Sequence, residues 1–241
     1  MAVRLWAAGS ALAGTATTLG LVAPTLNAND IMIAQIASED NDAHLAPDAD
    51  WTAINEVNNG TGLRSSIWWK RAAAADSGAT FTFTSFAGTT GNFGVIVAYR
   101  GCTVIGSPIG SSTNSTNASA DNVTYATLTP LSNESAIVAC GFYADDATTA
   151  ETVSGTTPVF DTTDVDVETA TGSGVGLSLF QSIARRNVGG ATGALTQASA
   201  SVTDAVNNGM LFELLNEFPI VSVNRGEAGV TYPRRVRQGN R

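Results

Sequence analysis

The sequence predicts an all-β protein: a two-sheet antiparallel sandwich of the jelly-roll or immunoglobulin-like type, with an extended C-terminal arm. Three observations lead to this prediction. Apolar and polar residues alternate with a period of two in many short segments. Turn-forming Gly, Asn, Asp and Ser residues separate these segments. No segment of ten or more residues combines the apolar spacing of a helix with helix-capping residues.

The clearest strand signals are at Leu63–Ala72, Thr80–Phe86 and Gly94–Arg100. The first two segments alternate apolar and polar residues, as half-buried strands do. The third has apolar residues on both faces, which is typical of a strand in the middle of a sheet that is covered on both sides. The turn formers Asp76-Ser77-Gly78 connect the first two strands. We therefore expect the three strands to form a β-meander.

The other expected strands follow the same reasoning along the chain. Those before the meander are Val3–Trp6, Leu19–Ala23, Ile31–Ala37 and Trp51–Val57. Those after it are Asn122–Leu128, Ala136–Tyr143, Glu151–Phe160, Gly176–Arg185 and Met210–Leu215. Turn-forming or acidic loops are expected at Ser10–Thr18, Glu39–Asp50, Thr103–Ala120 and Asp161–Ser173. No internal repeat is visible, so we predict one β-sandwich domain over residues 1–218 and an arm over residues 219–241.

Charge is distributed unevenly between these two parts. Residues 225–241 carry five arginines and one glutamate, a net charge of +4, whereas the rest of the chain carries seven basic and twenty acidic residues, a net charge of −13. An acidic body argues against nucleic acid as a partner. A basic arm on an acidic body indicates docking on an acidic neighbour, while a solvated C-terminus is the alternative.

The N-terminal stretch Met1–Pro24 superficially resembles a signal peptide. Its apolar part is broken by Gly and Thr residues, so we expect an opening β-segment instead. No stretch of the chain is long and apolar enough to span a membrane. Cys102 and Cys140 lie at or in apolar strands and are expected to be buried free thiols, although a disulfide between them stays open.

Residues for catalysis or metal binding are sparse. His44 is the only histidine, lies in an acidic loop and is expected to be exposed. Two acidic groups offer oxygen ligands for calcium without the spacing of an EF-hand loop, and solvated loops are expected. They are Glu39, Asp40 and Asp42, and Asp161, Asp164, Asp166 and Glu168. We predict no enzyme activity, no cofactor and no metal site.

Four stretches resemble a family of β-sandwich virion proteins of tailed phages, which are minor tail or decoration-type proteins. The stretches are APTLNANDIMIAQIAS (Ala23–Ser38), DADWTAI (Asp48–Ile54), WWKRAAAADSGATFTFT (Trp68–Thr84) and GVIVAYRGC (Gly94–Cys102). Asn29-Asp30 stands where family members usually have Gly-Asp. The resemblance weakens after Gly110. It implies a β-sandwich fold in a virion and supplies no catalytic pattern.

These observations together predict a non-enzymatic capsid decoration (cement) protein, assembled into the virion in the host cytoplasm. Its expected partners are other virion proteins, such as the major capsid or tail protein, and further copies of itself in a homo-oligomer. The arm would contact an acidic neighbour through Arg234, Arg235, Arg237 and Arg241. The alternative is a carbohydrate-binding module of a tail or fibre protein, which would use Trp68 and Trp51.

Overall fold

The computed structural model describes residues 2–10, 12–60, 62–86, 91–120, 122–132, 135–144, 152–155, 165–168, 178–185, 190–198 and 205–217. Within these ranges it contains sixteen strands and one short 3-10 helix, η1 (Ala74–Asp76), and every strand pair is antiparallel. The predicted all-β antiparallel sandwich is therefore confirmed. No helix in the described part of the chain is long and apolar enough to cross a membrane.

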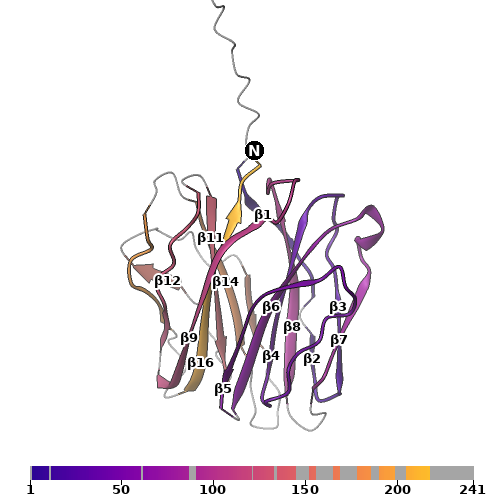
Figure 1. Cartoon of the computed structure of the whole chain (residues 1–241). Coiled ribbons are helices and arrows are strands. Elements are labelled where there is room, and N and C mark those ends of the chain that lie inside the picture. Colours follow the sequence, from indigo (N-terminus) through magenta and orange to yellow (C-terminus); the bar gives the residue numbers. More distant parts are fainter. Residues whose placement is uncertain are drawn as a thin grey trace, which may run out of the picture.

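The described strands form four sheets stacked in layers, whereas two sheets were expected from the sequence (Figure 1). Inner sheet 1 has the order β1 (Arg4–Ala8), β8 (Asn92–Arg100), β4 (Ile31–Ser38), β6 (Leu63–Arg71) and β5 (Thr52–Asn59), and β2 (Leu12–Gly14) also pairs with β8. Inner sheet 2 has the order β13 (Val165–Glu168), β14 (Ser178–Arg185), β11 (Ser135–Tyr143), β16 (Ala205–Leu215) and β9 (Ile109–Ala120). Outer sheet 1 pairs β3 (Thr18–Val22) with β7 (Thr80–Thr84), and outer sheet 2 contains β10 (Asn122–Tyr125), β15 (Leu195–Ala198) and β12 (Thr152–Gly155).

Three hydrophobic cores lie between these four layers. The central core fills the space between the two inner sheets, where Ile33 and Ile67 of inner sheet 1 share a cluster with Val138 and Phe212 of inner sheet 2. A second core lies between inner sheet 1 and outer sheet 1. The third lies between inner sheet 2 and outer sheet 2. Each inner sheet is consequently buried on both faces.

Strand β8 shows why this burial follows from the sequence. Val95 and Val97 point into the central core, whereas Ile96 and Ala98 point into the core under outer sheet 1. A strand with apolar residues at every position needs a cover on each side, because successive side chains point to opposite faces. The prediction that Gly94–Arg100 lies in the middle of a doubly covered sheet is confirmed.

The second half of the fold has a strand order similar to that of the first, apart from β2 and β12, which have no counterpart in the other half. In inner sheet 1, β4 lies between β8 and β6, with β1 and β5 outside them; in inner sheet 2, β11 lies between β16 and β14, with β9 and β13 outside them. The pair β3–β7 covers the first half, and β10–β15 covers the second. In each half the first strand pairs with the last, β1 with β8 and β9 with β16. A strand of the outer layer pairs with the second-last strand, β3 with β7 and β10 with β15, while the short β2 also pairs with β8. This nested order is that of a jelly roll rather than an immunoglobulin-like sandwich.

Polar side chains also connect the two halves across the central core. The Gln35 amide donates a hydrogen bond of 3.2 Å to the Gly141 carbonyl, and the Asn208 amide donates one of 2.9 Å to the Ser65 hydroxyl. All four residues lie on the inner sheets. Such buried polar contacts fix the relative register of two packed sheets, because any slip leaves a buried donor unpaired.

Several local expectations were wrong. Strands β6, β7 and β8 form no meander: β6 and β8 both flank β4, and β7 lies in the outer sheet. The predicted loop Thr103–Ala120 contains β9, the predicted loop Asp161–Ser173 contains β13, and the predicted loop Ser10–Thr18 contains β2. These strands lie at sheet edges or are very short, so they need no continuous apolar face that sequence patterning could detect. The predicted arm, residues 219–241, lies outside the described residues.

Candidate assembly interface

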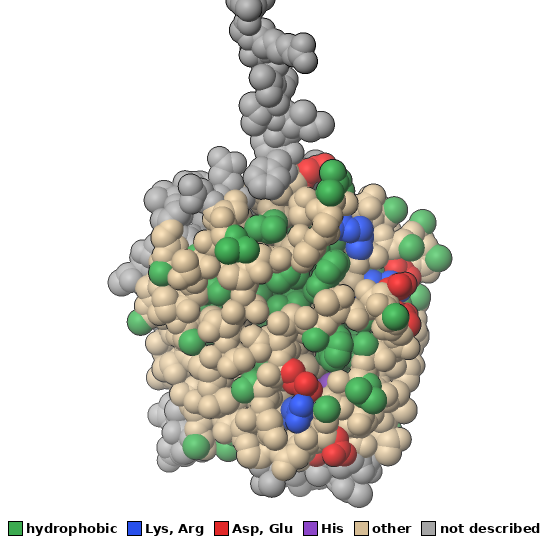
Figure 2. Space-filling model, in the orientation of Figure 1, with side chains coloured by type: hydrophobic (Ala, Val, Ile, Leu, Met, Phe, Trp, Pro, Cys, Tyr) green, Lys and Arg blue, Asp and Glu red, His purple; other side chains and the backbone are tan. Residues whose placement is uncertain are grey.

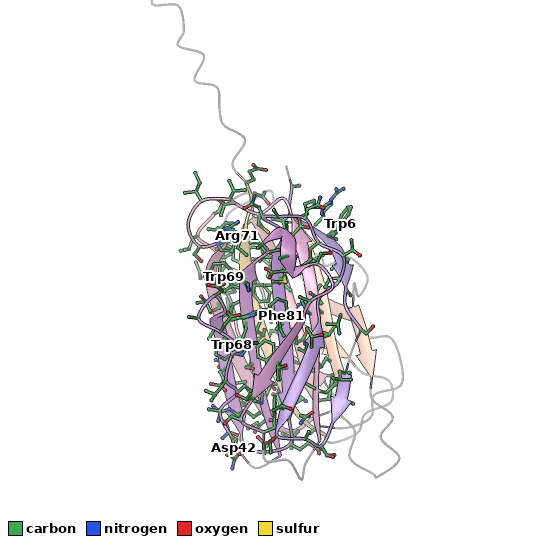
Figure 3. All side chains as sticks on the ribbon, turned by 90° about the vertical axis from the view of Figure 1, so that its right-hand side faces the viewer. Trp6, Asp42, Trp68, Trp69, Arg71 and Phe81 are labelled. Carbon is green, nitrogen blue, oxygen red and sulfur yellow. The ribbon has the colours of Figure 1, made fainter. Side chains whose placement is uncertain are left out.

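The described chain ends at one end of the layered body, which we call the arm end. There the Glu217 amide donates a 2.8 Å hydrogen bond to the Gly101 carbonyl, and the Val3 amide donates a 3.1 Å bond to Oδ1 of Asn216. Trp6 and Arg71 lie at the same end, and Asp42 lies at the opposite one (Figure 3). The C-terminal segment therefore leaves from a point that is fixed against the first strand and the connection between the two halves.

A stacked ion pair occupies the arm end. Both guanidinium contacts between Arg100 and the Asp30 carboxylate are 2.7 Å long, and the same guanidinium lies 3.5 Å from the centre of the Trp6 ring. Asp30 is buried, whereas Trp6 is 43% exposed. Hydrogen bonding to Asp30 raises the pKa of Arg100 above its ordinary value. The arrangement holds the indole of Trp6 rigidly at the surface, as is common for aromatic anchors in protein interfaces.

A pocket of about 240 Å³ opens beside this ion pair. Its lining residues are Asn27, Ala28, Asn29, Asp30, Arg100, Gly101, Cys102, Val104 and Glu217. Asn29 has a positive φ of 73°, a left-handed conformation that asparagine tolerates better than most residues. Because Glu217 forms part of the wall, the C-terminal segment begins at the rim of this pocket.

Two loops at the arm end carry strongly exposed apolar side chains. Ile105 is 83% exposed and Leu131 is 75% exposed, and these are the highest values among the large apolar residues that the structure describes. Val104 is also exposed and lines the pocket. We call Trp6, Val104, Ile105 and Leu131 the arm-end surface. Exposed large apolar side chains are frequent at protein interaction sites.

Hydrogen bonds from side chains hold these two loops in place. Glu213 is fully buried on β16, and its carboxylate accepts hydrogen bonds from the backbone amides of Leu131 (2.7 Å), Ser132 (2.9 Å) and Ser111 (3.3 Å). The Arg71 guanidinium donates a 3.1 Å bond to the carbonyl of Gly106, next to Ile105. A buried carboxylate is costly unless it is fully hydrogen-bonded. The Glu213 carboxylate meets this condition, and its hydrogen bonds fix the loop that carries the exposed Leu131.

The four arginines predicted to contact a neighbour, Arg234, Arg235, Arg237 and Arg241, lie outside the described residues. The structure places only the start of the segment that carries them, at the arm end. The Trp6–Arg100–Asp30 stack leaves no signal in the sequence, because its members are far apart in the chain. The sequence feature that could have indicated the exposed loop is the apolar pair Val104-Ile105, which lies between turn-forming residues.

The tryptophans of the carbohydrate-binding alternative serve in packing. Trp51 is buried and packs edge-on against Phe81 and Phe83, with ring centres 5.2 and 5.4 Å apart. Trp68 is partly buried against the same cluster, and its indole N–H donates a 3.0 Å bond to the Ser66 hydroxyl. In Figure 3, Trp68 and Phe81 lie between the two ends of the body. Trp51 therefore presents no ring face to solvent, whereas Trp68 is partly exposed.

His44 is buried, and the expectation that it is exposed was wrong. Its Nε2 lies 2.8 Å from the Ser38 hydroxyl and its Nδ1 lies 2.7 Å from the Ser66 hydroxyl. Since the Ser38 hydroxyl donates to Asp40, it must accept from Nε2, which places the proton of the neutral imidazole on Nε2. Burial lowers the pKa of His44 to about 4. The carboxylate bonds a serine rather than the imidazole, so the group lacks the geometry of a Ser-His-Asp triad.

The remaining candidates have structural partners. Lys70 lies between Asp48, Asp50 and Asp76, with N–O distances of 3.6–3.7 Å. Both cysteines are buried and free as expected, and burial raises the pKa of each thiol to about 12. Within the described residues, no group of three or more His, Cys, Asp or Glu side chains is placed to hold a metal ion.

The surface of the face in Figure 2 is mostly neutral and polar, with few charged side chains. This agrees with the low charge content of the chain, 14%. Comparison of the chain with protein-family models, with curated proteins and with solved structures found no match. The resemblance to phage virion proteins therefore stays a prediction.

Proposed function

We propose that this protein is a non-enzymatic structural protein of a tailed-phage virion, and specifically a capsid decoration (cement) protein. It binds an acidic surface of a neighbouring subunit through its basic C-terminal segment. One observation supports this most directly: the segment leaves the body at the end where a stacked tryptophan and exposed apolar side chains are held in fixed positions. A folded contact surface and a charged segment at one end form a natural two-part attachment site.

Three further features support the proposal. The layered body buries both faces of each inner sheet, so hydrophobic packing holds the central strands from both sides. The buried His44 network and the Lys70 cluster are explained by packing. The basic segment and the acidic remainder have opposite net charges, +4 and −13, which suits attachment between acidic subunits that would otherwise repel each other.

The proposal predicts that the arginines of the segment control occupancy on the particle. Replacing Arg234, Arg235, Arg237 and Arg241 by Gln should reduce the bound copies on purified particles several-fold, and raised salt should weaken wild-type binding. Deleting Pro233–Arg241 should have the same effect. Binding is measured by co-sedimentation with particles, and the thermal midpoint should not change.

The matched control replaces the same four arginines by Lys, which keeps the charge and should retain most of the binding. Occupancy that is unaffected by the Gln substitutions and by the deletion would remove the segment from the attachment site. A glycan array screened with the same protein tests the carbohydrate-binding alternative.

A further inference from the structure

We propose that copies of this protein associate head to tail, with the arm-end surface of one copy on the opposite end of the next. The inference rests on the proposed function, and it identifies one partner as a second copy of this chain. Figure 3 shows Trp6 and Arg71 at one end of the strands and Asp42 at the other, so the two surfaces can be occupied at the same time.

The arm-end surface suits a specific contact because its apolar groups are already ordered. Glu213 fixes the loop of Leu131, and Arg71 fixes the loop of Ile105. Asp30 and Arg100 hold Trp6. Association is less costly when the contacting groups lose little conformational freedom, and rigid aromatic and apolar anchors contribute most of the affinity of an interface.

The opposite end offers the complementary chemistry, and we call it the acidic end. The segment Glu39–Leu45 carries three carboxylates, of which Asp42 is exposed, Glu39 is half-buried and Asp40 is buried, and Leu45 is 53% exposed. The nearest cation, Arg64, is paired with Glu56 at 2.9 Å and donates a hydrogen bond to the Asn41 carbonyl. The segment is also held in place, because the His44 amide and imidazole both bond to the sheet. The basic segment and the arm-end surface of a second copy would therefore contact acidic and apolar groups at this end.

The length of the C-terminal segment makes this contact possible. Residues 218–241 number 24, and an extended chain of that length spans at most about 80 Å. The longest strand, β9, has 12 residues and spans about 40 Å. The segment can therefore reach along a neighbouring copy to acidic groups on it. A twofold contact between two arm ends would instead bring two +4 segments together, which electrostatic repulsion disfavours.

Two variants of the full chain test the head-to-tail arrangement by sedimentation velocity. The arm-end variant carries Ile105→Ser and Leu131→Ser, and the acidic-end variant carries Asp42→Lys and Leu45→Ser. We expect the wild type to associate as its concentration rises and to dissociate in high salt. Each variant alone should be monomeric, and an equimolar mixture should form a heterodimer and nothing larger, since only one intact pair of surfaces remains.

The control is Val22→Ser, which removes another exposed apolar side chain and should associate like the wild type. Thermal melting of each variant establishes that it is folded. A wild type that stays monomeric at all concentrations, an arm-end variant that still associates, or an acidic-end variant that dimerises alone would each overturn the inference. A monomeric wild type that still binds particles through its arginines would leave the proposed function standing.

Discussion

At the scale of single residues, His44 illustrates how the fold accommodates polar groups inside. A relay of hydrogen bonds runs from the Trp68 indole through Ser66 to Nδ1, and from Nε2 through Ser38 to Asp40. Every member is satisfied only while the imidazole is neutral, since Nδ1 acts as the acceptor for Ser66. Burial is the main cause of the low pKa, and the nearby Glu56 and Asp40 carboxylates only partly oppose it.

This network predicts a pH dependence of stability. Between the unfolded pKa of 6.5 and the folded value of about 4, the unfolded chain binds a proton that folded His44 does not. The free energy of unfolding should therefore fall as pH decreases from about 6.5 to about 4, by up to about 3 kcal/mol from this group. Urea unfolding at several pH values measures it, with His44→Gln as the reference that lacks the titrating group. Parallel pH curves for the two proteins would contradict this account of His44.

Glu213 is the second residue whose removal should have a large effect. Glu213→Ala leaves the backbone amides of Leu131, Ser132 and Ser111 without their acceptor. We expect a loss of about 3 kcal/mol in the free energy of unfolding, because three hydrogen bonds to one buried charged group are lost together. Glu213→Gln keeps the shape and one oxygen and should lose less. A Glu213→Ala protein as stable as the wild type would refute the role given to this carboxylate.

At the scale of elements, the sequence predicted strands according to how much apolar surface they bury. Strand β8 was predicted correctly because both of its faces are apolar. Strand β9, with the sequence IGSSTNSTNASA, was expected to be a loop because it is an edge strand with small polar residues. Side chains rather than apolar burial help to hold it: the Asn114 amide donates a 2.6 Å bond to Asn55, and the Asn117 amide donates a 2.7 Å bond to Asn207.

Strand pairing was harder to predict than strand position. The turn at Asp76-Ser77-Gly78 was predicted, and Gly78 has the positive φ of 72° that such a turn requires. A turn reverses the chain without fixing which sheet the next strand joins. Here β7 pairs with β3 in the outer layer, where Phe81 and Phe83 cover inner sheet 1. The similar strand order of the two halves is not accompanied by a sequence repeat: corresponding strands such as β4 (IMIAQIAS) and β11 (SAIVACGFY) share burial but not residue identity.

The start of β9 allows a test of this packing. A Cβ atom added at Gly110 would lie 2.8 Å from Cδ of Glu213, which is held by three backbone amides and cannot easily move. Gly110→Ala should therefore destabilise the protein by about 1–3 kcal/mol. In the Glu213→Ala background the same change should be far less costly, so a double-mutant cycle should show strong coupling. Gly62→Ala, which meets only ordinary contacts with Val206, is the control. Additive effects would contradict the predicted overlap.

At the scale of the whole molecule, two sandwiches with a similar strand order share one central core. The two ends of the body differ in their chemistry. The sequence predicted the sandwich class and the charge difference between body and C-terminal segment. It could not predict the arm-end surface, since Trp6, Ile105 and Leu131 are brought to one end only by the pairing of β1, β8 and β16. The same pairing places Arg100 between Asp30 and Trp6.

A cryo-electron microscopy map of purified particles with the protein bound would show directly whether it is a decoration protein. We expect four-layered density on the particle exterior, with Trp6 and Leu131 facing a subunit of the shell or a second copy, and with the C-terminal segment along an acidic surface. Density in which the arm end faces solvent while the Asp42 end contacts the shell would contradict this expectation, as would particles that carry no such density.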